Sequence, residues 1–127
     1  DHYKKKVIKI LNSVGNYVYN HLKSNKILIN SPQGAFYLMP EFINKKFNSS
    51  SDMCADLLNK KGVAILPGSD FGFSNEKMIA RLSYTDFDGT NFMKSVKNNY
   101  IDDAMIFKLA PKVVEGVKRI KDWVDNK

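Results

Sequence analysis

The sequence predicts a single α+β domain over residues 1–127, in which a small, mostly antiparallel sheet is packed with helices. Three observations lead to this fold class. Apolar residues recur at helical spacing near the N-terminus, short apolar segments bounded by glycine and proline fill the middle, and a second amphipathic segment begins at Pro111. A chain of 127 residues can bury one core but is too short for two.

The first helix is predicted from about Tyr3 to about Ser24. Its apolar residues alternate between spacings of four and three, which keeps them on one helical face: Val7, Leu11, Val14, Val18 and Leu22, widened by Ile10, Tyr17 and His21. His21 lies at the edge of this stripe, and no Cys, Asp or second His stands at ligand spacing from it. We therefore expect a partly buried packing residue rather than a metal ligand.

Three strands and one helix are predicted in the middle of the chain. The strands are 35–39 (after a turn at 31–34), 63–66 and 79–84, whereas 27–29 is only a short apolar run. The helix is 52–61, which follows a polar capping loop at 48–51, ends at Gly62 and is expected to bury Cys54, Leu57 and Leu58. Since no helix separates the last two strands, we expect them to pair antiparallel.

Two more helices are predicted towards the C-terminus. The spacing of Phe92, Met93, Val96 and Tyr100 indicates a helix after Gly89. Pro111 suits the first turn of the last helix, whose inner face is expected to carry Val113, Val117, Ile120 and Val124, with Trp123 alongside. The segment 86–109 receives no functional role.

Arg81 is the main candidate for a binding residue. Of the twenty basic residues, only Arg81 and Arg119 are arginine. Alternation in the strand 79–84 places Ile79, Arg81 and Ser83 on one face and Ala80, Leu82 and Tyr84 on the other. A planar, permanently charged fork is costly in an apolar strand, and lysine does not match its geometry. Two interpretations remain open: a carboxylate or phosphate ligand, or an internal Asp or Glu partner.

Composition restricts the classes of function. The net charge of +7 permits nucleic-acid binding, but the lysines are scattered, with 4–6 as the only run of three, so a basic binding module is the weaker alternative to solvated lysines. Cys54 alone allows no internal disulfide and no cysteine metal site, and it fits a reducing cytoplasm. No apolar run approaches the ~18 residues of a membrane span. Because the chain starts at Asp1 without a signal-peptide pattern, we expect it to come from a longer protein.

A second enzymatic interpretation rests on 85–90. Asp86, Asp88 and Thr90 match the D-x-D-x-T motif of haloacid-dehalogenase-type phosphatases, in which the first aspartate attacks phosphorus and the second acts as acid and base. That motif opens a large parallel sheet, for which too few residues follow, so a turn is the favoured interpretation. No Ser/His/Asp set, Cys/His pair or metal cluster can be assembled, and we assign no catalytic, cofactor-binding or metal residue to this chain.

The order of motifs in 31–84 resembles the C-terminal small domain of class I and II pyridoxal-phosphate-dependent aminotransferases, the aspartate aminotransferase superfamily. The matching pieces are Pro32-Gln33-Gly34-Ala35-Phe36-Tyr37, a capped helix ending at Leu57-Leu58, Gly62-Val63-Ala64-Ile65-Leu66-Pro67-Gly68, Phe71-Gly72 and Ala80-Arg81-Leu82-Ser83. No single piece is specific; the specificity lies in their order and spacing. The first helix, within residues 1–25, resembles the connector that leads into this domain.

The resemblance implies a function for the full-length protein. It would transfer an amino group between an amino acid, with aspartate one candidate, and a 2-oxo acid, as a homodimer. Arg81 occupies the position that binds the substrate's α-carboxylate in this family. Pyridoxal 5'-phosphate and its lysine would belong to a large domain that this chain lacks. The chain by itself is therefore expected to be inactive. Within the full-length protein it is expected to act as a mobile lid.

Overall fold

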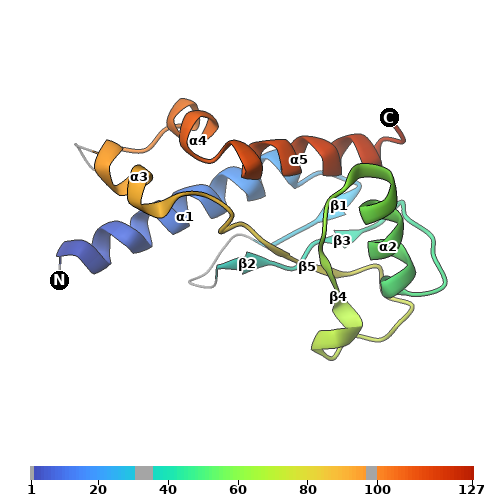
Figure 1. The fold of residues 1–127 in the computed structure, drawn as a ribbon. Coiled ribbons are helices and arrows are strands. Elements are labelled where there is room, and N and C mark those ends of the chain that lie inside the picture. Colours follow the sequence, from blue (N-terminus) through green and yellow to red (C-terminus); the bar gives the residue numbers. More distant parts are fainter. Residues whose placement is uncertain (1, 31–35, 97–99) are drawn as a thin grey trace.

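The computed structural model describes residues 2–30, 36–96 and 100–127. The elements, in chain order, are α1 (His2–Leu22), β1 (Ile27–Leu28), β2 (Tyr37–Leu38), β3 (Glu41–Phe42), α2 (Ser50–Lys61), β4 (Leu66–Pro67), the 3-10 helix η1 (Gly68–Phe71), β5 (Ala80–Ser83), α3 (Gly89–Ser95), α4 (Asp103–Leu109) and α5 (Pro111–Val124). Five α-helices and short antiparallel strands confirm the α+β class. Figure 1 shows α1 and α5 side by side along one side of the strands, with α2 next to β4.

The strands form two small antiparallel sheets. One has the order β2-β5-β4 and the other pairs β1 with β3. In the three-stranded sheet, Leu66 lies opposite Arg81 and Tyr37 lies opposite Ser83. The pairing of β4 with β5 across the 67–77 loop confirms the antiparallel prediction.

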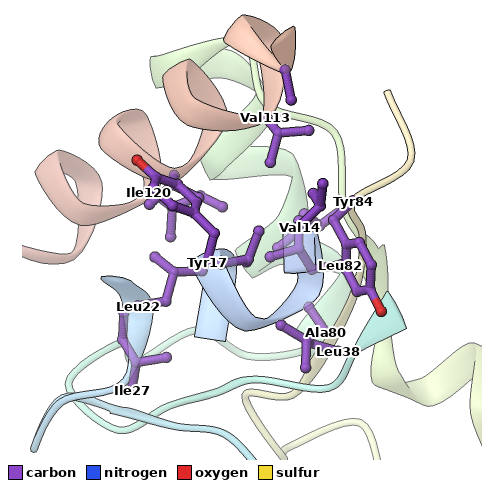
Figure 2. Packing of buried hydrophobic residues seen from close by; sticks show 14 of the residues in the cluster. Val14, Tyr17, Leu22, Ile27, Leu38, Ala80, Leu82, Tyr84, Val113 and Ile120 are labelled. Atoms are coloured by element: carbon purple, nitrogen blue, oxygen red, sulfur yellow. The ribbon is translucent and has the colours of Figure 1, made fainter. Parts of the chain in front are cut away.

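The core lies between α1, α5 and the inner face of the three-stranded sheet. Figure 2 shows Tyr17 and Val14 of α1 facing Ile120 and Val113 of α5, with Leu82 and Tyr84 beside them. Ala80, Leu82 and Tyr84 are buried, which confirms the predicted inner face of β5. Cys54 belongs to the same core, and burial raises the pKa of its thiol to about 11, so it packs as a small apolar side chain.

Both predicted ends of α2 are confirmed. The Ser49 hydroxyl accepts a hydrogen bond from the Asp52 N–H at 3.1 Å, which satisfies one of the free donors at the helix start. Gly62 follows the helix with φ of 69°, and its N–H donates to the Leu58 carbonyl at 2.9 Å. One core assignment was wrong: Leu58 is 50% exposed, because the buried face is centred on Met53 and Leu57 and Leu58 points about 100° away from Leu57.

Several predicted boundaries and elements need correction. The strand placed at 63–66 is formed only at Leu66–Pro67, and residues 62–64 before it line a pocket together with residues of α5. The strand placed at 35–39 is formed at Tyr37–Leu38, and the turn at 31–34 lies outside the described residues. The helix after Gly89 ends at Ser95, and Tyr100 beyond it is 71% exposed.

Three features were not predicted: the β1–β3 pair, η1 and α4. A signal for α4 was present. Asp102 accepts a hydrogen bond from the Met105 N–H at 2.9 Å, as an N-cap does, and buried Ile106 and Leu109 follow at helical spacing. His21 is 38% exposed, stacks near Tyr17 with ring centroids 4.2 Å apart, and lies 3.2 Å from the Asp103 carboxylate. It is thus partly buried, as expected.

Candidate substrate-binding site around Arg81

Arg81 is held on the outer face of the three-stranded sheet. It lies on β5, the central strand, where its neighbours Ala80 and Leu82 point into the core. Because side chains alternate along a strand, Arg81 projects to the opposite face, together with exposed Ser83. The cross-strand partners Leu66 and Tyr37 are on this outer face as well and are partly exposed.

Two aromatic rings lie against the Arg81 guanidinium. The central carbon of the guanidinium is 4.1 Å from the ring centroid of Tyr37 on β2 and 4.9 Å from that of Phe71 at the end of η1. Both distances are within the range of a cation–π attraction. We refer to Tyr37 and Phe71 as the ring pair. The sequence motifs contained both residues, but only the register of β2 on β5 and the path of η1 bring them to Arg81.

Arg81 forms no ion pair and no hydrogen bond to another residue of the described ranges through its side chain. The internal Asp or Glu partner that sequence reasoning left open is therefore not found within those ranges. Arg119, in contrast, forms hydrogen bonds to other residues through its guanidinium. Its Nε donates to Glu115 Oε1 at 3.0 Å and its NH1 group donates to the Lys61 carbonyl at 3.0 Å. Arg119 is thus used internally, whereas the Arg81 side chain donates to no residue of the described ranges.

Backbone hydrogen bonds hold both ends of the loop that carries Phe71. The Gly68 N–H donates to the Ile79 carbonyl at 2.7 Å, and the Phe73 N–H donates to the Gly68 carbonyl at 3.2 Å. The Ser50 hydroxyl is fully buried and bonds to the Ser69 hydroxyl at 3.2 Å, which fastens η1 to the start of α2. The position of Phe71 beside Arg81 is therefore set by the fold.

Of the two aspartates in the phosphatase-like motif, Asp88 has a structural role and Asp86 is exposed. Asp88 is the N-cap of α3, and its carboxylate accepts a hydrogen bond from the Asn91 N–H at 3.1 Å. Asp86 is exposed at the edge of a pocket. Within the described ranges, no three His, Cys, Asp or Glu side chains are placed to hold a metal ion together.

That pocket, of about 410 Å³, lies between α5, the 62–64 segment and the end of β5. Its floor is apolar, and it is formed by side chains such as Val18, Leu82 and Val117. Arg119 at its rim already has internal partners. Lys112 also lines this pocket, but a lysine ammonium lacks the planar fork with which an arginine such as Arg81 can bind a carboxylate through two parallel bonds. None of the helices in the described ranges combines the length and hydrophobicity that a membrane crossing requires.

Comparison with known proteins shows which proteins this chain is similar to. No family model matches the chain. An aspartate aminotransferase from Sulfolobus acidocaldarius is 36% identical over 84 residues, which are 63% of this chain and 21% of that protein. One from Sulfurisphaera tokodaii is 30% identical over 125 residues, which are 95% of this chain and 26% of that protein. The chain is homologous to part of an aminotransferase.

The fold agrees with this relationship. An alanine aminotransferase from Pyrococcus furiosus superimposes with a TM-score of 0.66 at 20% identity, covering 99% of this chain and 25% of that one. At this identity the likeness concerns the fold. This chain matches only 21% and 26% of the lengths of the two aspartate aminotransferases.

Lys45 is the lysine of the described residues whose pKa is clearly lowered, and its surroundings do not form a site for pyridoxal phosphate. The cofactor of this family needs a lysine in a cleft that can give up its proton. Burial lowers the pKa of Lys45, but its ammonium lies 4.3 Å from the Trp123 ring centroid and donates to the Asn126 side chain at 3.3 Å. Lys45 is thus engaged with the C-terminal end of α5 and not with the Arg81 face.

Proposed function

We propose that the full-length protein is a pyridoxal-phosphate-dependent aminotransferase, and that Arg81 binds the α-carboxylate of its amino-acid substrate. The observation that carries this proposal is the set of contacts made by the Arg81 guanidinium. Its guanidinium is fixed by two rings on the outer sheet face and has no acidic partner in the described residues. A bidentate fork with free donors is suited to a planar carboxylate.

The chain's contribution would be to bind and orient. A carboxylate held by two parallel N–H···O bonds cannot rotate freely, so the Cα–H bond of the substrate takes a defined direction. Pyridoxal phosphate, when bound by residues outside this chain, supplies the electron sink for the amino-group transfer. We propose aspartate as the first amino acid to test, because both sequence relatives above carry that name.

The remaining parts of the proposal concern the whole protein. This chain would be its C-terminal small domain, with α1 as the connector helix, and it would close towards a large domain when substrate binds and so exclude water. The enzyme would be a cytoplasmic homodimer that acts on an amino acid and a 2-oxo acid. These expectations rest on the aminotransferase family to which the homologues belong.

The test is Arg81→Lys in the full-length enzyme. Lysine keeps the charge but loses the fork, so KM for aspartate should rise and kcat/KM should fall. The fall should correspond to a loss of transition-state binding on the order of 2 kcal/mol. Arg119→Lys is the matched control, because the bonds of Arg119 are internal and its kinetics should stay within about twofold of wild type. Unchanged kcat/KM in Arg81→Lys would remove the assigned role.

A further inference from the structure

We infer that Tyr37 and Phe71 are positioning residues that hold the Arg81 guanidinium ready for a carboxylate without using its hydrogen-bond donors. This inference rests on the proposed function of Arg81 and adds the residues through which that function is set up. The rings come from two separate elements, β2 and the end of η1, and both lie against one cation on the outer face of β5.

The choice of partner for Arg81 matters chemically. A carboxylate beside the guanidinium would neutralise its charge and occupy the N–H groups that a substrate needs. An aromatic ring attracts the cation through its quadrupole but has no net charge. The ring pair can therefore restrict the side chain of Arg81 while leaving its full charge and its donors available.

Restriction is useful because arginine is a long side chain. A free arginine loses much rotamer entropy when it is fixed by a ligand, and that loss weakens binding. With the guanidinium already held 4.1 Å from one ring centroid and 4.9 Å from the other, part of the entropy is lost on folding instead. Removing a ring should therefore weaken carboxylate binding while the chemical step changes less.

The surroundings show that the ring positions are built into the fold. Phe71 is carried by η1, which the Ser50–Ser69 hydrogen bond and the Gly68–Ile79 backbone bond attach to α2 and to the residue before β5. A side chain at Gly68 would place its Cβ 2.8 Å from the Ile79 carbonyl oxygen, so the approach of η1 to this residue requires glycine. Tyr37 is placed by the pairing of β2 with β5.

The experiment removes one ring at a time in the full-length enzyme. Phe71→Leu and Tyr37→Leu should each raise KM for L-aspartate about three- to tenfold, with a smaller change in kcat. Tyr37→Phe keeps the ring and should raise KM less than Tyr37→Leu does. Phe73→Leu is the matched control, because Phe73 lies on the same loop, is 40% exposed against 39% for Phe71, and has no described contact with Arg81. Thermal unfolding of each variant separates loss of folding from loss of binding.

A double-variant comparison identifies the route of the effect. In an Arg81→Gln background there is no cation to hold, so Phe71→Leu should lower kcat/KM less than about twofold. An equal loss in both backgrounds would mean that the ring touches the substrate directly, and the positioning role would be wrong while Arg81 kept its function. If Arg81→Gln alone left kcat/KM unchanged, the proposed function itself would fail. If the Leu variants matched wild type while Arg81→Gln lost activity, only the positioning inference would fail.

Discussion

At the scale of single residues, the two arginines illustrate how environment assigns a role. Both carry the same charged fork, but Arg119 is bound to Glu115 and to the Lys61 carbonyl, whereas Arg81 faces two aromatic rings. The first arrangement joins α5 to the end of α2. The second leaves donors for a ligand, and this difference supports the proposal that Arg81 binds a carboxylate.

A second residue-scale feature is the Asp56–Trp123 hydrogen bond, which predicts a pH dependence. The Trp123 indole N–H donates to Asp56 at 2.9 Å, and with Lys60 it holds the pKa of Asp56 below its ordinary value. A carboxyl group whose pKa is lower in the folded state stabilises the fold above its unfolded pKa of about 4, and this stabilisation is lost as pH falls through the folded pKa.

Asp56→Asn should therefore lower the free energy of unfolding at pH 7 by about 1 kcal/mol, and the difference from wild type should shrink below pH ~4. Urea denaturation at pH 7 and pH 3 measures this. Trp123→Phe removes the donor, and the double variant should cost little more than the larger single change, because both remove the same bond. A difference that stayed constant with pH would contradict the role of the ionised carboxylate.

At the scale of elements, the helices were the most predictable part of the fold. The spacing of apolar residues, Ser49 before α2, Gly62 after it and Pro111 at the start of α5 are local signals, and the structure confirms each of them. The strands are only two to four residues long, and so short a segment has too little periodicity to define its ends. The β1–β3 pair and the true start of β4 depended on contacts from distant residues.

Two mid-helix glycines offer a test of element packing. Gly15 of α1 and Gly116 of α5 would both gain helix propensity as alanine, about 1 kcal/mol each. A Cβ at Gly15 would lie 2.7 Å from the Tyr84 ring and hydroxyl, whereas nothing lies within 4 Å of one at Gly116. Tyr84 is 1% exposed, so its ring is packed within the core.

Gly116→Ala should accordingly raise the free energy of unfolding by up to ~1 kcal/mol, and Gly15→Ala should lower it by roughly 1–3 kcal/mol through overpacking. Chemical denaturation of the two variants beside wild type provides the comparison. Stabilisation by both alanines would show that α1 and β5 are not as closely packed as described.

At the scale of the whole molecule, the chain has a core of its own and one outer sheet face that carries Arg81, the ring pair and other partly exposed apolar residues. A face of this kind is suited to close over a ligand held by another part of a protein. The chain spans 21% and 26% of the two aspartate aminotransferases it matches, so the cofactor chemistry would be supplied outside it.

We accordingly expect residues 1–127 alone to neither transaminate aspartate nor develop the visible absorbance of lysine-bound pyridoxal phosphate. The physical reason is that Lys45, the described lysine with a clearly lowered pKa, contacts the Trp123 ring and not Arg81. Mixing the purified chain with the cofactor and following both the spectrum and amino-group transfer tests this. Cofactor absorbance that persists through gel filtration would contradict the expectation that pyridoxal phosphate is bound by residues outside this chain.

The features that could be predicted from the sequence are local ones: the α+β class, the course of α1, α2 and α5, and the outward direction of Arg81. Helical spacing, caps and strand alternation depend on neighbours in the chain. It also indicated the aminotransferase relationship through the order of its motifs. The surroundings of Arg81 could not be predicted in this way, because Tyr37 and Phe71 reach it through the register of β2 and the path of η1. Contacts between residues far apart in the chain depend on how the elements pack, and no local pattern encodes them.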